Sequence, residues 1–90
     1  MKPRITISRT DKGELEIWLN ETGRDLLVSK LLGLDEISDH FHLGTYETAE
    51  IEMNDRAYRP TDEIVDAAKV FFRTDDWDQR YFPHVLEKVT

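Results

Sequence analysis

Apolar and polar residues alternate over two short runs near the start of the chain, residues 5–8 and 15–19. Such alternation is typical of strands that place one face against a core. The Asp11-Lys12-Gly13 stretch between the runs has the composition of a turn, because glycine readily adopts a positive φ. We therefore expect an antiparallel hairpin. Its apolar face would carry Ile5, Ile7, Leu15, Ile17 and Leu19.

The apolar period becomes helical over residues 22–33, where leucines recur at about every third or fourth position. Asn20 or Thr22 can cap this segment, and Thr22 with Asp25 three residues later resembles a capping box. Gly33 is placed to end the helix. We expect the helix to lay its leucines on the apolar face of the hairpin.

Residues 40–43 and 49–53 form a second alternating pair. Side chains alternate between the two faces of a strand, and paired residues of an antiparallel hairpin lie on the same face. If Phe41 and Leu43 face the same core as Ala49 and Ile51, odd-numbered residues must therefore pair with odd-numbered residues, so that the numbers of each pair sum to an even value. A three-residue loop centred on Tyr46 satisfies this condition. The register of this second hairpin then pairs Leu43 with Ala49 and Phe41 with Ile51.

The same register pairs His42 with Glu50 and His40 with Glu52 on the outer face. Imidazole and carboxylate groups both bind zinc and similar divalent ions, so a metal-binding protein is one alternative. The other interpretation is two cross-strand His–Glu pairs on a sheet surface. No third ligand is fixed by the local spacing, and we predict neither a bound metal nor another cofactor.

Residues 62–73 fit a helix by the spacing of their apolar positions and a strand by the composition of residues 69–73. The tail over residues 75–90 is rich in aromatic residues. We expect it to dock on the rest of the domain as a short helix or turn, with Asp75 or Asp76 as the cap.

The chain has 90 residues, of which 39% are hydrophobic and 34% charged. This length suits a single domain with a radius of gyration of about 12 Å, which leaves room only for a shallow site. Cysteine is absent, which excludes disulfides and thiolate sites and fits a reducing compartment. No apolar run is long enough for a membrane span, so we expect a soluble, cytoplasmic protein.

The net charge of -7 is concentrated in one part of the chain. Residues 35–66 hold ten acidic side chains against Arg56 and Arg59, a net charge of -8. Such a region repels phosphate backbones, so nucleic-acid binding is not expected, and it attracts basic protein partners. The alternative is that the acidic surface only maintains solubility.

Trp18 projects from the predicted hairpin on the face opposite its apolar residues. An exposed tryptophan ringed by polar groups is suited to bind a protein partner. The alternatives are that the tail aromatics Trp77, Tyr81 and Phe82 cover it, or that a homo-oligomer buries this outer face in itself. The candidate partner-binding residues are Trp18, His42, Glu47, Glu50, Glu52 and Asp55.

The string Asp39-His40-Phe41-His42-Leu43, the acidic segment after it and the later run Lys69-Val70-Phe71-Phe72 resemble the bacterial immunity protein 32 family. These are small proteins predicted to neutralise polymorphic toxins. The resemblance covers roughly residues 26–73. The chain departs from the family at residues 44–47, where the tryptophan and paired glycines of the family pattern are absent, and in its longer tail. The resemblance implies a strand near residues 66–73 and a basic toxin, often a nuclease, as partner.

Together these features predict an α+β fold, with a mainly antiparallel sheet of four or five strands and one main helix near residues 22–33 packed on one face. The chain has no GxSxG, P-loop or GxGxxG motif, so no enzymatic activity is expected. The predicted function is that of a small acidic binding protein that engages a basic partner.

Overall fold

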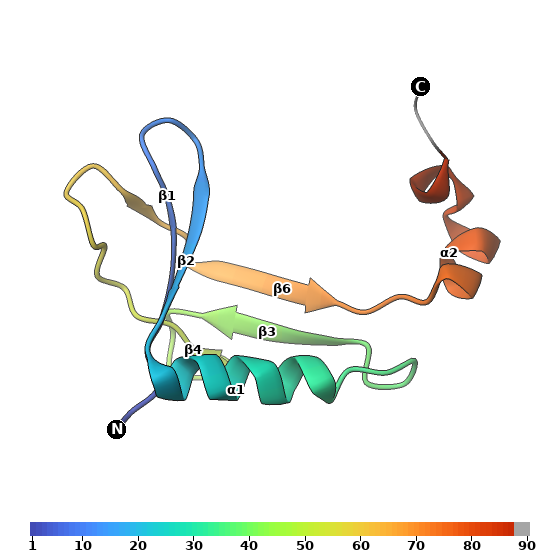
Figure 1. Cartoon of the computed structure of the whole chain (residues 1–90), viewed down its shortest axis with the longest axis horizontal. Helices are drawn as coiled ribbons and strands as arrows, with labels where there is room; N and C mark the ends of the chain where they lie inside the picture. The colour runs from blue at the N-terminus through green and yellow to red at the C-terminus, as the bar shows by residue number, and fades with distance from the viewer. Residues whose placement is uncertain (88–90) are drawn as a thin grey trace.

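The computed structural model describes residues 1–87 and has an α+β architecture. Its elements follow one another along the chain as shown in Figure 1: β1 (Ile5–Arg9), β2 (Leu15–Leu19), α1 (Glu21–Leu32), β3 (His40–Gly44), β4 (Ile51–Glu52), β5 (Glu63–Ile64), β6 (Ala67–Phe71), α2 (Asp75–Tyr81) and the 3₁₀ turn η1 (Pro83–Leu86).

The first hairpin is confirmed. β1 and β2 are antiparallel, with Ile5 opposite Leu19 and Ile7 opposite Ile17, and Gly13 in their turn has a φ of +86°. The main helix is confirmed as α1, and the strand expected near residues 66–73 is β6.

The expected single sheet is wrong. Over residues 1–87 the strands form two three-stranded sheets, in the orders β2-β1-β5 and β4-β3-β6. The chain passes from one sheet to the other between β5 and β6. The Val65 N–H donates to the Ile7 carbonyl in the first sheet, and the Asp66 carbonyl accepts from the Thr45 N–H in the second. This change of partner within two residues divides the strands between two sheets.

The expected second hairpin is also wrong. β4 is parallel to β3, with Leu43 opposite Ile51 and Gly44 opposite Glu52. The antiparallel neighbour of β3 is β6, which pairs with it along its whole length. Because β6 occupies one edge of β3, the chain returns after residues 45–50 to pair in parallel along the other edge.

The core lies between the two sheets and α1. Its buried apolar side chains are Ile5, Ile7, Phe41, Leu43, Ile51 and Met53, and Leu26, Leu27 and Leu34 pack against them. The helix runs beside β3 rather than across the hairpin (Figure 1). The leucines of α1 therefore do not cover β2. Leu15 and Ile17 are each 55% exposed and Leu19 is 39% exposed.

Asn20 holds the start of α1 and the N-terminal segment together. Its Oδ1 accepts hydrogen bonds from the Gly23 and Arg4 N–H groups at 2.7 and 2.9 Å, and its Nδ2 donates to the Lys2 carbonyl at 3.0 Å. Asn20, rather than Thr22, is therefore the cap of α1. Gly33 ends the helix as expected.

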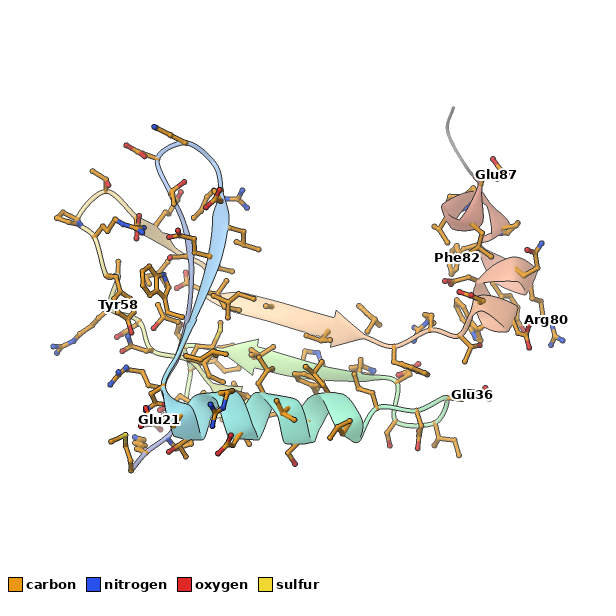
Figure 2. The ribbon with its side chains drawn as sticks, viewed as in Figure 1. Glu21, Glu36, Tyr58, Arg80, Phe82 and Glu87 are labelled. Atoms are coloured by element: carbon orange, nitrogen blue, oxygen red, sulfur yellow. The ribbon has the colours of Figure 1, made fainter. Side chains whose placement is uncertain are left out.

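The tail forms a short helix, but it lies beyond the end of β6 and not on Trp18. Thr74, rather than Asp75 or Asp76, caps α2. Figure 2 shows Arg80 and Phe82 well away from α1 and the sheets, and α2 and η1 contain no buried residue. The part of the expected docked tail at residues 88–90 lies outside the described residues.

The overall shape is open. The radius of gyration is 15.5 Å, and the principal extents are 42, 31 and 22 Å. A compact chain of this length would have a radius of about 12 Å. The projecting hairpin and the projecting tail account for the difference (Figure 1).

Candidate functional site

His42 and Glu50 come together on the outer face of β3. Alternation along β3 turns Phe41 and Leu43 into the core and His40 and His42 outward. One Glu50 carboxylate oxygen accepts from the His42 backbone N–H and lies 3.1 Å from His42 Nδ1. These two bonds, the side-chain bond first, lower the pKa of the Glu50 carboxyl below its ordinary value. The predicted contact between His42 and Glu50 is therefore present.

Asp39 connects the start of β3 to the end of β6. Its Oδ1 lies 2.7 Å from His40 Nδ1, and its Oδ2 accepts from Arg73 Nη1 at 2.8 Å. The hydrogen bond with His40 and the positive charge of Arg73 hold the pKa of the Asp39 carboxyl below its ordinary value, against the opposing effect of desolvation. The expected pair of His40 with Glu52 is not formed, and Glu52 instead lies 3.9 Å from Lys2 Nζ.

Phe71 of β6 stands opposite His40 and is 53% exposed. Lys69 Nζ lies 4.7 Å from the centre of its ring and the Arg73 guanidinium carbon 5.0 Å away. The His40 ring lies 5.7 Å away. We call His40, His42, Lys69, Phe71 and Arg73 the histidine face. It combines cations, imidazoles and an accessible phenyl ring.

An open cleft of about 500 Å³ runs between the C-terminal half of α1 and β3. Lys30 and Leu34 line it from the helix side, and His40, Phe41 and Glu50 line it from the sheet side. The cleft is shallow and mixed in polarity. It offers room for a peptide side chain rather than an enclosed substrate cavity.

Trp18 is partly covered by the segment between β4 and β5. The Tyr58 ring stacks on it with a centroid distance of 4.1 Å and an interplanar angle of 12°. The Arg59 guanidinium carbon lies 5.2 Å from the Trp18 ring. Tyr58 itself is 49% exposed and lies beside the first hairpin (Figure 2).

Arg59 is fixed by two carboxylates. Its Nη1 lies 2.6 Å from Glu16 Oε1 and 3.1 Å from Asp62 Oδ2. The bond to Glu16 is the first cause that raises the pKa of the Arg59 guanidinium, and Asp62 adds to it. We call the segment between β4 and β5 the Tyr58 strap. The Arg59–Glu16 pair ties it to β2, and Asp62 holds the same guanidinium from within the segment.

The remaining candidate residues lie on the segment that includes β4. Glu47, Glu50, Glu52 and Asp55 are all exposed, and we call them the acidic segment. Within residues 1–87, Glu47 and Asp55 have no ion-pair partner, whereas Glu50 meets His42 and Glu52 lies near Lys2. Two of the four carboxylates are thus available to an external cation.

Over the described part of the chain, no three His, Cys, Asp or Glu side chains gather in a way that could hold a metal ion. Neither helix within residues 1–87 has the length and apolar character needed to cross a membrane.

Sequence reasoning missed Asp39, Arg73 and Tyr58. Asp39 and Arg73 are 34 positions apart, and only the pairing of β3 with β6 brings them together. Tyr58 lies in an irregular segment whose path over β2 no local pattern indicates.

No family model, curated protein or solved structure matched the chain in comparisons with known proteins.

Proposed function

We propose that this chain is a non-enzymatic binding domain that engages a basic protein through its acidic segment. The observation that carries this proposal is the pair of exposed carboxylates, Glu47 and Asp55, without an ion-pair partner in residues 1–87, in the part of the chain with a net charge of -8. Unpaired carboxylates on one segment attract a cationic surface and speed its approach.

Tyr58 takes the role that the sequence suggested for Trp18. It is half-exposed, lies three residues after Asp55 and is held rigidly by its stack on Trp18. A rigid aromatic side chain beside charged groups is typical of residues that dominate a binding interface. The resemblance of residues 26–73 to the immunity protein 32 family adds a partner class to the proposal, a basic toxin.

The test uses charge reversal at residues whose side chains have no structural partner in residues 1–87. The Glu47→Lys/Asp55→Lys variant is compared with the wild type in affinity capture from a lysate of the source organism, at low and high salt. We expect a basic protein to be retained by the wild type and released by salt. The variant should bind the captured protein at least about tenfold more weakly, a loss of roughly 1.4 kcal/mol.

The matched control is Asp11→Lys/Glu14→Lys, which makes the same charge change at exposed positions of the first turn. It should retain the partner. Equal loss of binding in both variants would show only an effect of net charge. Equal retention in both would overturn the assignment of the acidic segment.

A further inference from the structure

β2 is the outer strand of its sheet, and no backbone group within residues 1–87 bonds to its outer edge. The hydrogen bonds at the two ends of the hairpin establish which backbone groups point outward. Asn20 N–H donates to the Arg4 carbonyl and Thr10 N–H donates to the Glu14 carbonyl. In an antiparallel ladder every second residue pairs with the neighbouring strand. The inward residues of β2 are therefore Glu16 and Trp18, and the backbone groups of Leu15, Ile17 and Leu19 point away from β1.

The bonds on the far side of β1 agree with this assignment. The Ile5 and Ile7 carbonyls accept from Asn54 and Val65, so the odd-numbered residues of β1 face away from β2. The same three residues of β2 that present free backbone groups also present exposed apolar side chains. A free edge and an uncovered apolar strip therefore coincide on one short strand.

The other long edges are blocked. Lys69 is the central residue of β6, which forms the outer edge of the other sheet. If β6 paired antiparallel with the β6 of a second copy about this residue, the two lysine ammonium groups would face each other and repel. β4 pairs with β3 only at Leu43 and Gly44, which leaves the rest of that edge of β3 without a neighbouring strand. There the Glu50 carboxylate accepts a hydrogen bond from the His42 N–H and so occupies the outward backbone donor. Natural sheets protect their edges with lysine, proline or covering groups. The sequence of β2, Leu-Glu-Ile-Trp-Leu, contains neither lysine nor proline.

The chain exposes more surface than a compact monomer of the same mass. The accessible surface is 7012 Å², whereas a compact monomer of 10.6 kDa would expose about 5,500 Å². The excess of about 1,500 Å² exceeds the roughly 800 Å² that each partner buries in a standard interface. The tail contributes to this excess together with the β2 strip.

We infer that a second copy of this chain pairs with β2, antiparallel and about a two-fold axis at Ile17. This register places Ile17 opposite its own copy and Leu15 opposite Leu19 of the other copy. All outward backbone groups then find partners, and the apolar strips join on one face. The sequence of β2 is apolar at its centre and at both ends, so it is complementary to itself when reversed. The pairing extends the sheet β2-β1-β5 across both copies.

The first test is the mass of the wild-type chain by sedimentation equilibrium. We expect twice the chain mass of 10.6 kDa at micromolar concentration. Hydrogen exchange on the same sample should show protected amides at Leu15, Ile17 and Leu19. A monomer overturns the inference. So does a dimer in which these amides exchange as freely as solvent-facing groups.

The second test locates the axis. Ile17→Lys and Ile17→Glu are each expected to be monomeric, because the axis opposes like charges. An equimolar mixture should recover the dimer, because a lysine then faces a glutamate. Ile37→Lys changes a 93% exposed isoleucine outside the strands and should stay dimeric. Failure of the mixture to associate, or a dimer in either Ile17 variant alone, contradicts pairing at this position. Neither test involves the acidic segment, so the proposed function stands or falls separately.

Discussion

At the residue scale, Gly23 shows how one atom constrains the fold. A Cβ at this position of α1 would run into the backbone carbonyl of Arg4, which Asn20 holds in place. Alanine normally favours a helix over glycine by about 1 kcal/mol. Here we expect the Gly23→Ala variant to lose about 1–3 kcal/mol, because backbone atoms must move to admit the methyl group.

Gly33→Ala is the matched control for this prediction. An added Cβ there meets only ordinary contacts of 3.5 and 3.6 Å, and φ is -79°. Its stability should stay the same or rise slightly. Urea denaturation of the two variants measures the difference. A Gly23→Ala variant as stable as Gly33→Ala would contradict the close approach of Arg4.

Glu50 gives a prediction about pH. Its folded pKa lies below the ordinary value because of the bonds from His42. A carboxyl with a lowered folded pKa contributes stability above its unfolded pKa and loses it as the pH falls through the folded pKa. Glu50→Gln should therefore melt at a lower temperature than the wild type at pH 7. The two melting curves should converge in acid, below the ordinary glutamate range. A difference that persists unchanged in acid would assign the effect to packing.

At the element scale, the alternation of residues predicted the inward faces of β3 and β4 correctly and their relative direction incorrectly. Leu43 and Ile51 are both odd-numbered. If paired residues have numbers of the same parity, these two side chains lie on one face of the sheet whether the strands run parallel or antiparallel. The observed register joins residue 43 to residue 51, a shift of eight, and the same shift relates His42 to Glu50. The antiparallel hairpin pairs those two residues as well, which is why their contact could be predicted from the wrong topology.

The contacts that sequence could not predict depend on distant segments. His40 meets Asp39 rather than Glu52, because only the antiparallel register would bring it to Glu52. The helix α1 and the first hairpin follow from local periods and composition. The strand β6 follows only from the resemblance, because the apolar spacing of residues 62–73 by itself favours a helix. The division into two sheets depends on the change of partner at Val65 and Asp66, for which the sequence has no local signal.

The Tyr58 strap is an element without regular structure, and it gives the third prediction. Tyr58→Ala should expose Trp18, shift its fluorescence to longer wavelength and cost about 0.5–1.5 kcal/mol for the lost stack. The measurement uses a Trp77→Phe background, so that Trp18 is the only tryptophan. Tyr81→Ala, at a 56% exposed position of α2, is the control and should leave the emission unchanged. An unshifted spectrum in the Tyr58 variant would contradict the strap.

At the scale of the whole molecule, composition predicted a compact domain and the chain is open. The apolar residues are present, but Leu15, Ile17 and the aromatic residues of the tail are not enclosed by the chain itself. A composition counts side chains that can be buried and does not say whether one copy of the chain buries them. The α+β class and the small size were predictable, whereas the shape was not.

The openness of the fold also has a thermal consequence. The heat-capacity change on unfolding grows with the apolar surface that becomes hydrated, and typical domains give about 12–15 cal/mol/K per residue. The core of one chain is confined to the side chains between α1 and the two sheets. We therefore expect the heat-capacity change of the monomer to lie below that range, so that its stability depends only weakly on temperature. Pairing through β2 would return the value toward the typical range. Scanning calorimetry of a dilute and a concentrated sample therefore reports, without any substitution, how much of the apolar surface the chain hides by itself.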